Sequence, residues 1–139
     1  MFESSLLAVL AADSTLTDYL STYGSRPAIF SNSAPAQVDF DYMVFTISDT
    51  GNGDSVVNEF RVSIDFFGYG KSGANIRSAI RRTIELLDRT HLTHDYYDSI
   101  RLFKGGIEFI ETEDPKAQHY NLEFTARAGR SGWMDEISS

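Results

Sequence analysis

The chain has 139 residues and a formal net charge of −8 at pH 7; 42% of its residues are apolar and 23% are charged. These values predict one folded domain and argue against binding of duplex DNA through a basic face. The lack of cysteine excludes disulfides, thiolate metal ligands and cysteine nucleophiles. No apolar run approaches the roughly 20 residues that cross a bilayer, and the N-terminus does not resemble a signal peptide, so we expect no membrane partner.

Two short helices are expected before Gly24. Leucines recur there at spacings of three and four, and Asp13 or Ser14 can cap the second helix. Gly24 and Pro27 stop further helix. Residues 25–41 are rich in turn formers, so they are expected to form a loop around a brief strand.

Four strands are expected at residues 42–48, 56–67, 100–110 and 118–127. Two of them alternate strictly between apolar and polar side chains. The apolar positions are Phe60, Val62, Ile64 and Phe66 in one strand and Tyr120, Leu122, Phe124 and Ala126 in the other. The pair Gly105 and Gly106 interrupts the third strand and predicts a bulge or bend.

The helix between the second and third strands begins at Ser72 or Gly73, and its apolar stripe continues to Leu87. The order of elements predicts an α+β fold, a four-stranded and mainly antiparallel sheet with one long helix and two short N-terminal helices packed on one face. Residues 1–127 are expected to form this single domain. Residues 128–139 are expected to form a C-terminal tail, or an extended arm.

Side chains suited to catalysis are concentrated in one segment, residues 91–98, which holds His91, His94 and two aspartates. A metal or acid-base site is the alternative there, but no third ligand sits at a defined spacing. A surface loop with aromatic anchors is therefore favoured. Gly68, Gly70 and Gly73 match a GxGxxG spacing, but the strand before them appears antiparallel, which favours turn glycines. We expect no enzyme activity, no catalytic residues, no cofactor and no metal.

Candidate interaction residues fall into five groups. The expected long helix carries an arginine stripe that pairs with Glu85 in the same helix or contacts a neighbouring copy. Contact with a neighbouring copy requires a complementary surface, such as the polar side of the second strand. Two polar turns extend from the ends of strands, and Trp133 docks on its own domain or in a neighbour's pocket. The residues are Arg77, Arg81 and Arg82 in the stripe; Glu59, Arg61 and Asp65 on the strand; Gly51, Asn52, Gly53 and Asp54 in one turn; Glu111, Glu113 and Asp114 in the other; and Trp133.

Over nearly its whole length, the chain resembles the tail terminator, or tail completion, proteins of long-tailed bacteriophages. The resemblance lies in the faces of strands and helices. The residues that carry it are Leu6, Leu7, Leu10, Leu16 and Leu20 in the opening helices, Arg26, Phe30 and Pro35 in the loop, the strands at residues 42–45 and 60–67, and the helix end at residues 85–87.

The resemblance implies a hexameric ring that caps the tail tube and joins it to the head connector. It implies three partners: other copies of the chain, the tail tube protein, and a head connector or neck protein. DNA would only pass through the channel. It also implies a place in the virion after assembly in the host cytoplasm, with the two polar turns at axial contacts. A neck or head-closing adaptor of the same particle and a small non-phage oligomeric binding domain are the alternatives.

Overall fold

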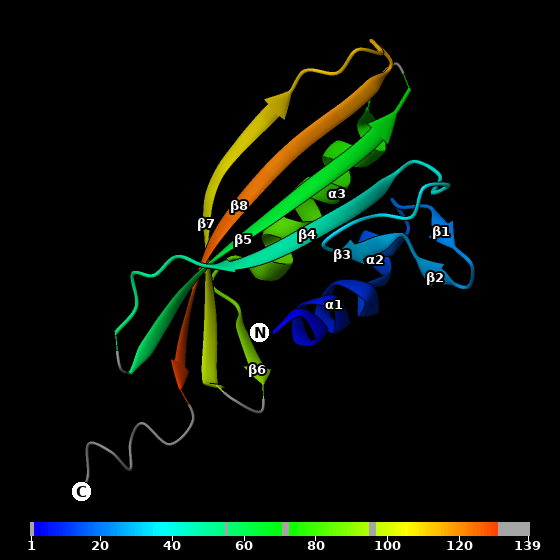
Figure 1. Ribbon diagram of the computed structural model, residues 1–139. Coiled ribbons are helices and arrows are strands. Elements are labelled where there is room, and N and C mark those ends of the chain that lie inside the picture. The colour runs from blue at the N-terminus through cyan, green and yellow to red at the C-terminus, as the bar shows by residue number, and fades with distance from the viewer. Residues whose placement is uncertain (1, 55, 71–72, 95–96, 131–139) are drawn as a thin grey trace, which may run out of the picture.

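The computed structural model describes residues 2–54, 56–70, 73–94 and 97–130. Its helices are α1 (Glu3–Ala12), α2 (Ser14–Thr17) and α3 (Ala74–Leu87). Its strands are β1 (Thr22–Tyr23), β2 (Arg26–Pro27), β3 (Ile29–Ser31), β4 (Tyr42–Asp49), β5 (Val57–Tyr69), β6 (His91–His94), β7 (Tyr97–Ile110) and β8 (Ala117–Arg130) (Figure 1). Among these residues, no helix has the length and apolar character needed to cross a membrane.

Six of the strands form one strongly twisted sheet in the order β3-β4-β5-β8-β7-β6 (Figure 1). β3 runs parallel to β4, and the other neighbouring strands are antiparallel. β1 and β2 pair separately in a small two-stranded sheet. The long central strands β5 and β8 therefore form the middle of the molecule.

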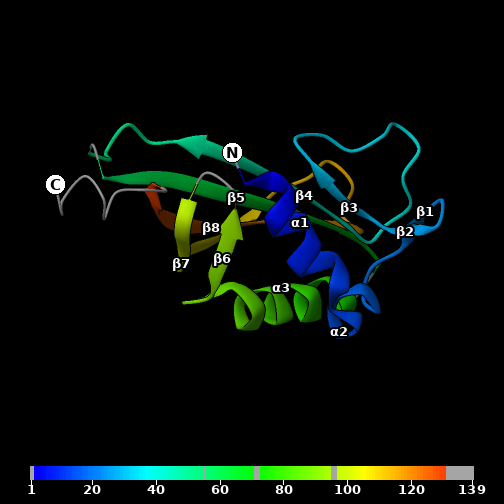
Figure 2. The ribbon, with the colours of Figure 1, turned by 90° about the horizontal axis from the view of Figure 1, so that it is seen from below.

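The helices cover one face of the large sheet, which we call the inner face, and α3 lies along it (Figure 2). The apolar positions that the alternation assigns to one side of β5 and β8 point to this face, and Phe66, Ile64 and Leu122 are fully buried there. Ile76 of α3 and Leu6 of α1 belong to the same core. The opposite face, which we call the outer face, carries the polar positions of the same strands.

Glycine is required where α3 meets β5. A Cβ atom at Gly68 would lie 2.9 Å from Cβ of Ile76, so a larger residue would push the helix from the sheet. Gly73 precedes α3 with φ of +59°, a conformation that glycine adopts without strain. These two positions give the glycine spacing a structural explanation.

The predicted bulge in the third expected strand is confirmed. The pairing of β7 with β8 shifts between Lys104 and Ile107, so that Gly105 and Gly106 together oppose one residue of β8. Beyond the bulge, Ile107 and Phe109 pair with inner-face positions of β8 but remain 47% and 54% exposed. The inner face is therefore incompletely covered at this end of the sheet.

The predicted four-stranded sheet with one long helix is wrong. The large sheet has six strands, and strands predominate over three short helices. β6 lies in the segment that was expected to be a surface loop, and only Leu92 of its four residues is buried. Short edge strands of this kind contain too few residues to show an alternating pattern. β8 runs to Arg130, three residues beyond the expected end of the domain at residue 127. Residues 131–139, with Trp133, lie outside the described residues.

Candidate functional site

Polar side chains of the outer face join β5 to β8. Nε2 of His119 lies 2.9 Å from Oδ1 of Asp65, and Asn121 donates from Nδ2 to Oγ of Ser63 at 2.8 Å and to the same Asp65 oxygen at 3.2 Å. All four residues are partly buried. Asp65, one of the candidate interaction residues, is therefore held by its own sheet.

An aromatic strip crosses the outer face from the small sheet to β8. Its rings belong to Tyr23, Phe30, Tyr42, Phe67 and His119, with successive centroid distances of 5.7, 6.3, 4.8 and 4.3 Å. Burial in this strip raises the pKa of Tyr42. The residues come from five different strands, so sequence alone gives no signal that they meet.

The 51–54 turn, which joins β4 to β5, is tied down by side chains. Glu59 accepts hydrogen bonds from Oγ1 of Thr50 at 2.8 Å and from Nδ2 of Asn52 at 3.1 Å, and these bonds lower the pKa of the Glu59 carboxyl. Asp54 accepts from the backbone amides of Val56 and Val57. The structure thus brings Glu59 together with the turn, although sequence reasoning placed them in separate groups.

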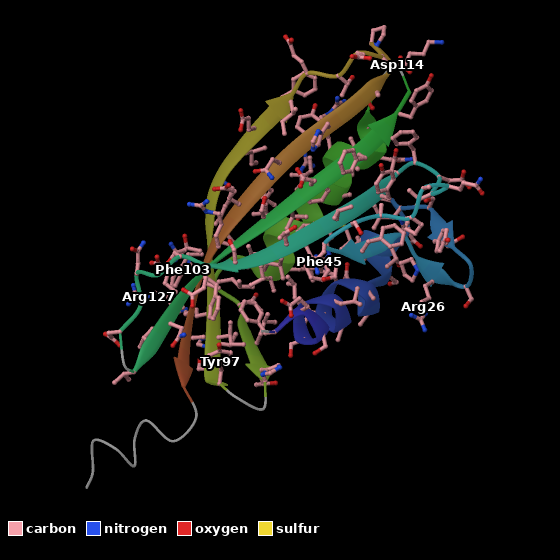
Figure 3. The ribbon with its side chains drawn as sticks, viewed as in Figure 1. Arg26, Phe45, Tyr97, Phe103, Asp114 and Arg127 are labelled. Atoms are coloured by element: carbon pink, nitrogen blue, oxygen red, sulfur yellow. The ribbon has the colours of Figure 1, made fainter. Side chains whose placement is uncertain are left out.

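The 111–115 turn, which joins β7 to β8, lies at the other end of the sheet (Figures 1 and 3). Glu111, Glu113 and Asp114 are exposed. Oδ1 of Asp114 accepts a hydrogen bond from the backbone amide of Lys116 at 2.9 Å. The negative charge of Asp114 also raises the pKa of Tyr69 at the end of β5. One end of the sheet therefore presents a cluster of acidic groups.

The three arginines of α3 differ in their surroundings. Arg82 binds the Asp13 carboxylate through Nη2 at 2.8 Å and Nε at 2.9 Å, and contacts Glu85 at 3.2 Å. The hydrogen bonds from Arg82 lower the pKa of Asp13, which also accepts from the amide of Leu16 as the N-cap of α2. Arg77 and Arg81 are exposed and form no ion pair within the described part of the chain. Of the three arginines on α3, Arg77 and Arg81 are therefore the ones that remain available to a partner within the described part of the chain.

An arginine patch lies on the outer face, away from the acidic turn, and sequence reasoning named its Arg61 but missed its other two members. Arg101 of β7 pairs in register with Arg127 of β8, and Arg61 of β5 lies diagonally beside them opposite Thr125. All three arginines are exposed, and Cζ of Arg101 is 5.5 Å from the ring centroid of Phe103. Phe103 and Arg127 are labelled in Figure 3. Like charges on directly opposed strand positions repel each other, but Arg127 is also directly opposite Glu59 of β5, and its positive charge contributes to the lowered pKa of that carboxyl.

An apolar pocket of about 360 Å³ lies between α1, the small sheet and β3. It is lined by Leu7, Ala11, Tyr23, Arg26, Pro27, Ile29, Phe30 and Pro35. Arg26 contributes its one charged side chain and is exposed (Figure 3). Sequence reasoning singled out none of these residues as a binding site.

The histidine segment takes part in the sheet. His91 lies on β6 with Nδ1 3.1 Å from Oγ of Ser99, while Asp95 and Tyr96 lie outside the described residues. Among the described residues, no three His, Asp or Glu side chains are arranged to hold a metal ion.

The comparisons with known proteins point to one fold. No protein-family model matches the sequence, and no curated protein matches it. The fold is similar to that of a chain in a solved structure described as the virion of a native gene transfer agent particle, with a TM-score of 0.71 and 15% identity. That similarity covers 91% of this chain and 92% of the other. At this level of identity the likeness establishes a shared fold.

Proposed function

We propose that this chain is a structural protein of a phage-like virion, and that it acts as a tail terminator. It forms a hexameric ring on the end of the tail tube and joins the tube to the head connector. The observation that carries this proposal is the fold that the chain shares, over nine-tenths of both lengths, with a chain of a gene transfer agent virion. The sequence resemblance to tail terminators supports the narrower assignment.

The positions of the exposed charged side chains on α3 and in the 111–115 turn support a ring. Copies that are related by rotation need two different surfaces that complement each other, because each copy uses one surface for each neighbour. Arg77 and Arg81 project from α3, whereas the acidic 111–115 turn lies at an end of the sheet. Contact between these surfaces in neighbouring copies would set the register of the ring.

The 51–54 turn suits a contact along the ring axis. It lies at the end of the long sheet opposite the 111–115 turn, so it can face the tube or the head while the acidic turn contacts a neighbouring copy (Figure 1). The 51–54 turn is held by Glu59 and the 111–115 turn is held by its own Asp114, so both are ordered before any partner binds. A pre-ordered turn loses less conformational entropy on docking.

The direct test is assembly on the tail tube. Purified chain and the tube protein of its own particle are mixed, and tube ends are viewed by electron microscopy while light scattering gives the mass of the free chain. The expected result is a ring at one end of each tube, arrested tube growth, and a complex of about six times the 15.6 kDa chain mass. Tubes that grow unchanged without the chain at their ends would contradict the proposal. Binding to the connector alone would indicate a neck adaptor.

A further inference from the structure

The apolar pocket beside α1 has room for a large side chain and a charge at its edge. Its volume of about 360 Å³ lies within the range of specific ligand pockets, and its lining is apolar except for Arg26. Arg26 forms no ion pair within the described part of the chain. A matching occupant combines an aromatic group with a nearby carboxylate.

The C-terminal segment of the chain has this composition. Residues 131–139 read Ser-Gly-Trp-Met-Asp-Glu-Ile-Ser-Ser, so Trp133 and Met134 are followed directly by Asp135 and Glu136. Tryptophan is the side chain most suited to filling a desolvated pocket at an interface. The two acidic residues after it complement the charge of Arg26.

The segment cannot bring Trp133 to the pocket of its own copy. Ile29, which lines the pocket, pairs in register with Met43 of β4, and Met43 pairs with Phe66 of β5. Near the end of β8, Gly129 pairs in register with Val57 of β5. Phe66 and Val57 are nine positions apart on β5, which corresponds to about 30 Å at roughly 3.3 Å per residue. Trp133 is three residue steps beyond Arg130, and these steps span at most about 11 Å. Figures 1 and 2 both show the end of β8 and the small sheet at opposite ends of the molecule.

We propose that the pocket binds the C-terminal segment of a neighbouring copy, with Trp133 among the apolar side chains and Asp135 or Glu136 beside Arg26. This inference rests on the proposed ring and names one of its contacts. Because donor segment and receiving pocket lie at opposite ends of each copy, the contact is head-to-tail. A head-to-tail contact repeated by rotation closes a ring.

Trp133 is the only tryptophan of the chain, so its fluorescence reports on this contact alone. Wild-type protein is diluted through its association range while mass and emission are measured together. The expected result is a blue shift and loss of acrylamide quenching that appear at the same concentrations as the oligomer. Emission that stays red while the mass rises, or that is blue-shifted at every dilution, would overturn the inference.

Two neighbouring alanines of α1 provide a matched pair of variants. Ala11 lines the pocket, whereas Ala12 is exposed and does not line it. Ala11→Glu fills the pocket and repels the acidic residues, so it is expected to raise the dissociation constant between copies about 30-fold or more. Ala12→Glu is expected to change it only a few-fold. Equal effects of the two variants would contradict a role for the pocket.

Charge reversal tests the part assigned to Arg26. Arg26→Glu and the double variant Asp135→Lys, Glu136→Lys are each expected to weaken association about tenfold, and their combination is expected to restore it. A misfolded variant would not be rescued in this way. Failure of the combination to recover association would remove the ion pair from the proposal.

Mixing two variants shows which copy supplies the tryptophan. The Trp133→Ala chain has an open pocket but no tryptophan, and the Ala11→Glu chain has a blocked pocket but retains Trp133. If the tryptophan of one copy docks in the pocket of another, mixing the two variants is expected to shift the emission to the blue. If both variants instead form the wild-type ring, this inference is overturned while the proposed function stands. If wild-type chains associate neither alone nor on tubes, the proposed function fails and the contact between copies fails with it.

Discussion

The two faces of the large sheet are made by alternate residues of the same strands, yet they are stabilised in different ways. On the inner face, Phe45, Phe66 and Phe124 are removed from water by the helices and by one another. On the outer face, Asp65 and Asn121 take part in directional hydrogen bonds, and much of the surface stays in contact with solvent. Burial of apolar surface stabilises the inner face, whereas directional hydrogen bonds between side chains stabilise the outer face.

The difference separates the residues that maintain the fold from those available to partners. Complete burial of a large apolar side chain contributes about 1.5–3 kcal/mol, whereas a typical hydrogen bond contributes a net 0.5–1.5 kcal/mol. The outer face can therefore change more than the inner face before the chain unfolds. Substitutions on the two faces and on α3 should show this as a graded series.

The largest effect is expected on the inner face. Phe66→Ala removes a fully buried ring from the contact between β5 and the core, and should lower the free energy of unfolding by about 3–5 kcal/mol. Urea denaturation followed by circular dichroism measures this change. Phe103→Ala is the control on the outer face, where the ring is 37% exposed, and should cost less than about 1 kcal/mol. Similar losses from both variants would show that the faces do not differ as described.

A smaller effect is expected where α2 meets α3. Asp13→Ala removes the N-cap of α2 and the partner of Arg82, and should lower the free energy of unfolding by about 1–2 kcal/mol. Asp13→Asn keeps a capping oxygen but loses the negative charge, so it should be less destabilising. If the alanine and asparagine variants are equally unstable, the cap contributes nothing measurable.

Acid should abolish the difference between wild type and Asp13→Asn. The Arg82 guanidinium holds the pKa of Asp13 below its ordinary value of 3.8 in the folded state. A lowered pKa means that the ionised carboxylate stabilises the fold fully above pH 3.8, and that this contribution is lost as the pH falls through the folded-state pKa. Unfolding curves at a series of pH values should therefore converge in acid, and a gap that widens in acid would contradict the assignment.

Local patterns predicted the inner face better than they predicted the rest of the molecule. The alternation in β5 and β8 assigned the buried side chains, and the Gly105–Gly106 pair predicted the bulge, because each signal lies within one strand. The short strands β3 and β6 contain too few residues to alternate, so the four-stranded sheet was the wrong conclusion. Strands too short to show an alternating pattern therefore could not be predicted as members of the sheet.

The candidate surfaces were harder to predict because they depend on pairs that are distant in sequence. Arg82 reaches Asp13, which is 69 residues away, and this contact removes one of the three arginines from the predicted stripe. The arginine patch requires the register between β7 and β8, which no motif encodes. Composition could suggest an interaction protein, but only the fold shows which charges are already paired.

On the outer face, Asn121→Ala should lower the free energy of unfolding by about 1 kcal/mol, because the amide donates to both Ser63 and Asp65 across the two central strands. Thermal unfolding is the measurement. Thr125→Ala, on the same strand and face but exposed, should stay within about 0.5 kcal/mol of wild type. An Asn121 variant as stable as the Thr125 variant would show that the outer-face hydrogen bonds do not hold β5 to β8.

The smallest effect on stability is expected on α3, where the effect on assembly should be large. Arg77 and Arg81 have no ion pair within the described residues, so Arg77→Glu with Arg81→Glu should change the free energy of unfolding by no more than about 0.5 kcal/mol. Position 77 lies in the first turn of α3, where a negative charge interacts favourably with the helix dipole. Sedimentation should nevertheless show weaker association between copies, because the reversed charges would face the acidic turn of a neighbour. Unchanged association would show that both arginines belong to a solvated surface. Weaker association at unchanged stability would show that the two arginines contribute to contacts between copies and not to the stability of the fold.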